Sequence, residues 1–317
     1  MITFLNQPKL SPHEIYNPLN QRRLSLLPHL ESFLNQHPLF KDKDVEVFFP
    51  PVGAASLTCI LDTSDIKKVL KIPLSPKSFY EYEGTFLLAW EKVGVSVPHV
   101  VEEGTIDGSY YLLMDFIDAK TLQETYKKGE MIRKEIFMKM GSMLRTMHTA
   151  TSEGFGSIKD GKGRYAQFNE WLADEIARRR PDIDEVGDDF SVAVTTLSKF
   201  IGSSSESRYC HNDFAYQNIF ATEPLTVFDP VPVLNHPYMD LAGAIIKAIG
   251  RGISDEAAEQ LIKGYSDGAG DLDRAALQAA LIVQSHMLFT VWSQTGKEQG
   301  IKDVRAYLEK TNNLLTI

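Results

Sequence analysis

The spacing of hydrophobic and polar residues changes twice along the chain. A polar lead-in punctuated by prolines contains one helical stretch, residues 19–34, in which Leu24, Leu27, Leu30 and Leu34 recur at helical spacing. Short runs rich in β-branched and aromatic residues follow and predict strands, since turn-forming residues separate them. The predicted strands are 45–49, 56–61, 68–72, 97–101 and 110–114.

Helical periodicity dominates the remainder of the chain. A helix is predicted over 79–93, between the third and fourth strands, where Gly94 and Pro98 follow it as stop signals. Further helical segments are predicted at 131–148, 168–180, 197–200, 240–249, 255–265 and 274–293. A small strand-like island at 208–229 interrupts them, and the acidic stretch 182–189 is predicted to be a solvated loop.

This order of elements predicts an α+β fold with two lobes. We expect residues 1–44 to form a helical lead-in, and residues 45–117 to form a lobe built on a five-stranded antiparallel sheet with one helix. Residues 118–317 are expected to form a mostly helical second lobe. A chain of 317 residues is long enough for two hydrophobic cores of this size.

Composition and charge narrow the range of partners. The net charge of −9 argues against nucleic acid or an anionic membrane as the main partner, because both require a basic surface. It is compatible with a cationic small substrate, or simply with a soluble surface. Cys59 and Cys210 are far apart and in no metal-binding spacing, and the N-terminal residues do not resemble a secretory signal. Leu241–Ile249 is too short to span a bilayer, so a cytoplasmic location is expected.

The strand-like island carries the candidate chemistry. Asp213 precedes Asn218 by five residues, and Asp229 ends a short apolar run. Phosphoryl transfer needs a group that orients the attacking hydroxyl and oxygen ligands that hold Mg²⁺ against the phosphates. We therefore expect Asp213 to accept the hydroxyl proton, Asn218 and Asp229 to bind the metal, and His211 to pack beneath the loop.

The string His211-x-Asp213-x-x-x-x-Asn218, followed by a strand that ends in an acid, resembles the aminoglycoside phosphotransferase and choline kinase superfamily. That superfamily shares the protein-kinase fold. Further segments resemble it in the same order: the Leu-Arg-Thr-Met-His run that ends at His148, and the His-Pro-Tyr-Met-Asp-Leu-Ala run that contains Asp240. Together the matches cover roughly residues 45–250. Asp240 is expected to hold the catalytic loop through hydrogen bonds.

The resemblance implies a nucleotide site in the first lobe, with ATP or GTP as co-substrate. Lys71 would grip the phosphates and pair with Glu83, although Glu81 lies nearby as an alternative partner. Ser56 follows the expected phosphate loop. The backbone groups of Asp115 and Ile117 would meet the base at the hinge.

Three positions depart from the family pattern. Asn212 stands where glycine is usual, and asparagine tolerates the left-handed backbone conformation better than most residues. Gly53 is the sole glycine of the expected phosphate loop, which puts a tight wrap over the phosphates in doubt. Pro230 follows Asp229 where a second acid is common, so that metal ligand is missing.

The resemblance implies a small-molecule hydroxyl as acceptor. The net charge suggests an amino-bearing acceptor such as an aminoglycoside, with a resistance role among the options. The acids of the predicted helix 168–180, which are Glu170, Asp174 and Glu175, are candidates to receive its amino groups. A solvated helix face is the simpler interpretation of these acids.

Three other functions fit parts of the pattern. His211 and Asp213 with His236 or His286 would match a two-histidine, one-carboxylate iron site, which usually lies in a β-rich fold. A protein kinase is disfavoured, because the short interval between Asp229 and Asp240 leaves no room for an activation loop. A non-catalytic nucleotide-binding module is the remaining alternative.

Overall fold

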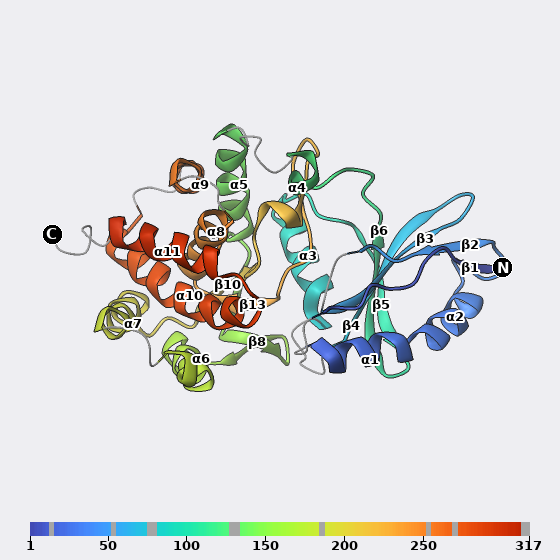
Figure 1. Cartoon of the computed structure of the whole chain (residues 1–317), viewed down its shortest axis with the longest axis horizontal. Coiled ribbons are helices and arrows are strands. Elements are labelled where there is room, and N and C mark those ends of the chain that lie inside the picture. Colours follow the sequence, from blue (N-terminus) through green and yellow to red (C-terminus); the bar gives the residue numbers. More distant parts are fainter. Residues whose placement is uncertain are drawn as a thin grey trace. The chain divides into compact units, whose positions relative to one another are not determined.

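The computed structural model describes residues 1–12, 16–51, 55–74, 81–126, 134–183, 188–251, 255–267 and 272–311 (Figure 1). The chain forms two compact units. Residues 1–88 and 97–118 make the first unit, and residues 89–96 and 119–317 make the second. The structure has the predicted α+β character, with a strand-rich N-terminal unit and a largely helical remainder.

A six-stranded sheet in the order β1-β2-β3-β4-β6-β5 forms the first unit. The strands are β1 (Ile2–Phe4), β2 (Val45–Phe48), β3 (Ser56–Asp62), β4 (Lys67–Pro73), β5 (Val100–Ile106) and β6 (Ser109–Asp115). The last five form the predicted antiparallel sheet, although β5 lies three residues further along the chain than predicted. The lead-in adds β1, which pairs parallel to β2 and was not predicted.

One face of this sheet packs on a hydrophobic core, and the other face carries Lys71. Helices α1 (Asn17–Ser25) and α2 (Leu27–Gln36) lie along one face (Figure 1), where Leu30 and Leu34 join the core beneath Leu70 and Ile72. Because successive strand residues point to opposite faces, Lys71 points away from that core. Helix α3 (Glu83–Lys92) begins on the Lys71 side.

Helices make up most of the second unit. They are α4 (Leu122–Thr125), α5 (Lys134–Met147), α6 (Phe168–Ile183), α7 (Asp188–Ile201), α8 (Pro237–Ile249), α9 (Asp255–Ser266), α10 (Arg274–Gln294) and α11 (Glu298–Thr311). Helix α10 packs against α7, α8 and α11 (Figure 1). By length and composition alone it could span a bilayer, but 67% of its most apolar stretch is buried inside the protein. This is typical of a core helix.

The second unit contains a five-stranded sheet of order β7-β10-β13-β8-β9. Its strands are β7 (Thr151–Glu153), β8 (Phe155–Lys159), β9 (Lys162–Tyr165), β10 (Glu206–Cys210) and β13 (Val233–Asn235). Only β10 overlaps the strand-like island predicted at 208–229, and the other four strands were not predicted. The short strands β11 (Ile219–Phe220) and β12 (Thr226–Val227) form a separate antiparallel pair. The island therefore supplies strands to two different sheets.

Other differences from the predicted elements are local. The helix expected to end at Arg180 continues to Ile183, and α7 begins at Asp188, so that the predicted acidic loop is shorter than expected. Helix α11 was not predicted. Gly53 of the expected phosphate loop and residues 184–187 of the acidic loop lie outside the described residues.

Candidate active site

The catalytic-loop candidate connects β10 to β11 in the second unit. β10 ends at Cys210, and a short 3₁₀ turn, Tyr216–Asn218, leads into β11. Asn212 has a positive φ of 58°, as its replacement of glycine suggested. This left-handed residue turns the chain sharply after β10.

Asp240, in the first turn of α8, anchors the loop. Its Oδ2 accepts a hydrogen bond from the backbone N–H of His211 at 2.6 Å, and its Oδ1 accepts one from that of Asn212 at 2.8 Å. His148 Nε2 lies 3.1 Å from the same carboxylate, and the other ring nitrogen of His148 contacts the hydroxyl of Tyr265 at 2.8 Å. The predicted structural role of Asp240 is therefore confirmed in its geometry.

His211 is fully buried beneath the loop. Its Nε2 lies 2.9 Å from the carbonyl oxygen of Phe228, and its Nδ1 accepts the backbone N–H of Asp213 at 3.2 Å. Because a carbonyl can only accept, Nε2 carries the proton and Nδ1 is free to accept. Burial is the largest effect on the ring and lowers the pKa of His211, which favours this neutral form. The indole of Trp90 stacks on the ring at 5.6 Å.

The Asp213 carboxylate is held from two sides. Lys247 Nζ lies 3.1 Å from Oδ1, and Asn218 Nδ2 donates to Oδ2 at 2.9 Å. Burial raises the pKa of Asp213, but the ammonium of Lys247 and other nearby cations outweigh it, so the net pKa is below the ordinary value for aspartate. The carboxylate is therefore ionised at neutral pH and can accept a proton. Its side chain stays 30% exposed.

Asn218 and Asp229 are brought together by the β11–β12 pair. Ile219 pairs with Val227, and the backbone N–H of Phe228 donates to the carbonyl of Asn218 at 3.1 Å. The amide nitrogen of Asn218 donates to the backbone carbonyl and to the carboxylate of Asp213. The amide oxygen, Oδ1, takes no part in these two bonds. Asp229 has a φ of 57°, a conformation that is uncommon outside glycine and often marks functional sites. An amide oxygen and a carboxylate fit the hard oxygen ligands that Mg²⁺ prefers.

Lys71 and Glu83 form a buried ion pair in the first unit. Lys71 Nζ lies 2.5 Å from Glu83 Oε2, and the two side chains are 6% and 1% exposed. Glu81, the alternative partner, is exposed. The predicted ion pair is thus present, and it is formed by Glu83.

The other residues expected at the nucleotide lie in the same unit. Ser56 begins β3 and is buried, and its carbonyl accepts a hydrogen bond from Arg23 at 3.1 Å. Asp115 ends β6, where its carboxylate lies 2.5 Å from Lys68 Nζ and its N–H donates to the carbonyl of His99. Ile117 follows β6, and its backbone N–H makes no hydrogen bond within the described part of the chain.

The three acids proposed for substrate binding lie on α6 and have partners of their own. Glu170 accepts the backbone N–H of Gln167 at 3.1 Å, as in a helix cap. Asp174 accepts hydrogen bonds from the Tyr165 hydroxyl at 2.7 Å and from Arg178 Nε at 2.9 Å. Glu175 also pairs with Arg178. These contacts neutralise part of the negative charge of that face.

The alternative chemistries lack a suitable arrangement. His236 accepts the backbone N–H of Tyr238 at the start of α8, and His286 packs between aromatic rings in α10, so each has a structural place.

His148, Cys210 and Asp240 place donor atoms within 4.8 Å of one another. However, burial raises the pKa of the Cys210 thiol well above its ordinary value, with a further contribution from Asp240. A protonated thiol is a poor ligand and a poor nucleophile.

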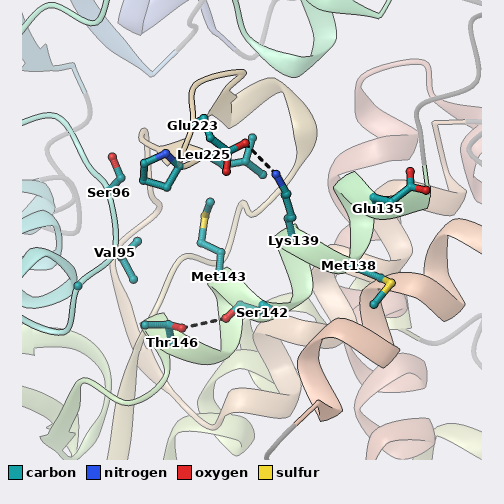
Figure 2. Close-up of a pocket in the computed structure, with 12 residues that line it drawn as sticks. Val95, Ser96, Glu135, Met138, Lys139, Ser142, Met143, Thr146, Glu223 and Leu225 are labelled. Carbon is teal, nitrogen blue, oxygen red and sulfur yellow. Dashed lines mark hydrogen bonds and ion pairs between the residues drawn. The ribbon is translucent and has the colours of Figure 1, made fainter.

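A pocket of about 500 Å³ lies elsewhere in the second unit. Helix α5, the segment that follows α3 and the loop before β12 line it, and Lys139 pairs with Glu223 at 2.8 Å beside it (Figure 2). No residue proposed above for the site lines this pocket.

Sequence reasoning missed the cations around Asp213. Lys247 donates to the carbonyl of Asn212 at 2.7 Å as well as pairing with Asp213. Arg251 and Lys297 also lie close enough to act electrostatically on this region. One signal was available for Lys247: it stands seven residues after Asp240, which puts both on one face of a helix. No feature of the sequence indicated that Arg251 and Lys297 act on the region of Asp213.

Comparisons with known proteins identify the family of the chain. The model of a phosphotransferase enzyme family matches residues 49–278. An uncharacterized Staphylococcus aureus protein from the ileS 3′ region is 30% identical over 89 residues, which are 27% of this chain and 68% of that protein.

Solved structures share the fold, among them the following two. A thermostable mutant of the aminoglycoside phosphotransferase APH(4)-Ia, in a ternary complex with ADP and hygromycin B, aligns with a TM-score of 0.63 and 14% identity over 89% of this chain and 97% of that one. Spectinomycin phosphotransferase APH(9)-Ia, in complex with ADP and spectinomycin, aligns with a TM-score of 0.55 and 14% identity over 90% and 92%. At this identity the likeness establishes the fold.

Proposed function

Since the chain belongs to the phosphotransferase enzyme family, we propose that it transfers the γ-phosphate of a nucleoside triphosphate, ATP or GTP, to a hydroxyl group of a small molecule. One observation carries this proposal. The Asp213 carboxylate is kept ionised by Lys247 and oriented by Asn218, within a loop whose backbone Asp240 holds. A fixed, ionised carboxylate of this kind suits a hydroxyl nucleophile.

The proposed step is an in-line displacement. The acceptor oxygen forms a bond to the γ-phosphorus while the bond between that phosphorus and the β–γ bridging oxygen breaks. The hydroxyl proton passes to an oxygen of Asp213, and the nucleoside diphosphate leaves with the electron pair of the broken bond. Asp213 then returns its proton to solvent. Lys247, 3.1 Å from the carboxylate, stabilises its ionised form.

We assign the nucleotide to the 45–117 lobe and the acceptor to residues 118–317. Lys71, oriented by Glu83, would hold the α- and β-phosphates, with Ser56 near the phosphate loop and the backbone of Asp115 and Ile117 at the base. Asn218 and Asp229 would hold Mg²⁺, which when bound neutralises phosphate charge. The two buried free cysteines and the acidic composition support a cytoplasmic protein without nucleic acid or membrane partners.

An amino-bearing acceptor is the first candidate. The net charge of −9 supports it, and so do the similar structures that hold hygromycin B and spectinomycin. Glu170, Asp174 and Glu175 would receive the amino groups. Because Asp174 and Glu175 already pair with Arg178, an amino group would have to displace that guanidinium.

Acceptor-dependent release of nucleoside diphosphate tests the function. ATP and GTP are each incubated with Mg²⁺ and a panel of aminoglycosides, amino sugars, amino alcohols, hydroxy acids and hydroxy amino acids. A kinase releases diphosphate faster with one acceptor class and yields its phosphate ester. A non-catalytic nucleotide-binding module, the alternative function, would bind Mg²⁺-nucleotide in calorimetry yet give no ester with any acceptor.

A further inference from the structure

Three cations from two distant parts of the chain interact electrostatically with the proposed base. Lys247 lies in the last turns of α8, Arg251 follows the end of that helix, and Lys297 immediately precedes α11. All three act electrostatically within one cluster: Lys247 and Arg251 lower the pKa of Asp213, and Asp213 in turn raises that of Lys297.

Close packing at the end of α8 brings these segments together. A side chain at Gly300, in the first turn of α11, would come within 2.6 Å of the carbonyl oxygen of Gly250. The ring of Trp292 fills the space beside Gly250, and the Lys297 ammonium lies 6.0 Å from the centre of that ring. The two helix ends therefore fix where Arg251 and Lys297 emerge.

Arg251 is held in place without its full set of hydrogen bonds. Its guanidinium lies 5.4 Å from the centre of the Tyr216 ring, three residues beyond Asp213. Its Nη1 is buried and has no hydrogen-bond partner among the described residues. A buried donor that belongs to a charged group is costly to leave unsatisfied, so this position favours an incoming anion.

Of the three cations, Lys247 alone is paired with an acid among the described residues. Lys247 is committed to Asp213 and to the carbonyl of Asn212. Neither Arg251 nor Lys297 forms an ion pair with an acid in the part of the chain that the structure describes. Burial is the largest effect on Lys297 and lowers its pKa, and the nearby charge of Arg251 lowers it further. An anion placed here would relieve that repulsion.

We infer that the phosphate acceptor carries an anionic group, a carboxylate or a phosphate, which Arg251 and Lys297 bind while Asp213 receives the hydroxyl proton. This inference rests on the proposed kinase function, and it puts an anionic acceptor in place of the amino-bearing acceptor that the net charge suggested. The same cations could instead hold the γ-phosphate of the nucleotide, and the experiment separates these two sources of negative charge.

The test compares matched acceptors that differ in their anionic group. D-glycerate and glycerol phosphate are compared with glycerol, and serine is compared with ethanolamine, each with ATP and Mg²⁺. We expect kcat/KM at least about tenfold higher for the anionic members. Arg251→Gln and Lys297→Gln should remove that advantage through acceptor KM, and Arg251→Lys should restore part of it. Lys302→Gln, an exposed lysine on α11, is the matched control and should change nothing.

Titration of the anionic acceptors tests the inference without measuring turnover. D-glycerate and glycerol phosphate are titrated into the full chain loaded with Mg²⁺ and a non-hydrolysable ATP analogue. Binding that Arg251→Gln weakens about tenfold, with Lys302→Gln unaffected, supports the inference. It is overturned if neither anion binds in an Arg251-dependent way, or if neutral and amino-bearing acceptors are preferred. It is also overturned if Arg251→Gln changes nucleotide affinity instead. Turnover of a cationic acceptor would defeat the inference and leave the kinase function standing.

Discussion

Asp240 Oδ1 accepts a hydrogen bond from the backbone N–H of Asn212 at 2.8 Å, next to the bond that its Oδ2 accepts from His211. A single buried carboxylate thus fixes two consecutive peptide groups directly before Asp213. This arrangement explains how a loop of polar residues keeps one conformation.

The first prediction concerns this anchor. Asp240→Asn should lower the free energy of unfolding by about 3 kcal/mol, because an amide can no longer accept from both peptide groups with a full negative charge. Turnover should fall with it, as Asp213 loses its position. Asp273→Asn is the matched control: Asp273 caps α10, and asparagine caps almost equally well, so the change should be below about 0.5 kcal/mol. An Asp240→Asn protein as stable as the control would refute the anchoring role.

A second prediction concerns the left-handed residue of the loop. Asn212→Gly should keep the unfolding free energy within about 1 kcal/mol of the natural chain, because glycine accepts the positive φ. Asn212→Ala should be less stable than Asn212→Gly by about 1 kcal/mol. At Asn169, an exposed position in α6, the order should reverse, since alanine is the better helix former. Chemical denaturation of the four variants provides the comparison.

The third prediction is a pH dependence of stability. Burial, with smaller contributions from His148 and Arg208, lowers the pKa of His236 to about 4, and its Nδ1 accepts the N–H of Tyr238 as the cap of α8. Because the folded-state pKa lies below the unfolded value, the stabilisation is complete above the ordinary pKa of 6.5 and is lost as the pH falls toward about 4.

Unfolding free energies at about pH 7 and about pH 5 measure this effect. The natural chain should be less stable at the lower pH, and His236→Asn should show a smaller difference, because asparagine caps the helix without titrating. An unchanged difference in that variant would assign the pH dependence to other groups.

A fourth prediction separates the Lys71–Glu83 pair from a surface ion pair. Lys71→Met should cost about 3 kcal/mol, because it removes the ammonium from a buried carboxylate. The double variant Lys71→Met/Glu83→Gln should recover part of that loss. Lys67→Met, on the same strand but in an exposed pair with Asp62, should cost less than about 1 kcal/mol.

Nucleotide binding gives the second measurement on these variants. Both proteins that lack Lys71 should bind Mg²⁺-nucleotide more weakly, whereas Lys67→Met should bind it normally. Normal affinity in the double variant would exclude Lys71 from the phosphate site.

Much of the fold was predictable because its signals are local. Short apolar runs separated by turn-forming residues predicted β2, β3, β4 and β6, and the eight-residue string from His211 to Asn218 indicated the catalytic loop. The strands of 151–165 escaped prediction because they are short and polar, with turns such as Asp160-Gly161 between them. Strand β1 depends on parallel pairing with a segment more than forty residues away, which no local pattern encodes.

The candidate site was predictable only in part for the same reason. The acids and the amide of the loop are close in sequence. Arg251 and Lys297 meet through the packing of α8 against the start of α11, and this contact is tertiary. The sequence therefore suggested an amino-bearing acceptor from net charge, whereas the local charge beside Asp213 is positive.

The central claim is that Asp213 accepts the hydroxyl proton while Asp229 serves the metal and nucleotide. The most direct measurement is calorimetry of Mg²⁺-nucleotide binding beside turnover, for Asp213→Asn, Asp229→Ala and Asn218→Ala. Asp213→Asn should bind nucleotide almost normally and lose about 10²- to 10⁴-fold in kcat. Asp229→Ala should lose nucleotide binding as well, and Asn218→Ala should resemble it in milder form. Near-full turnover in Asp213→Asn, or normal Mg²⁺-nucleotide binding in Asp229→Ala, would contradict the account.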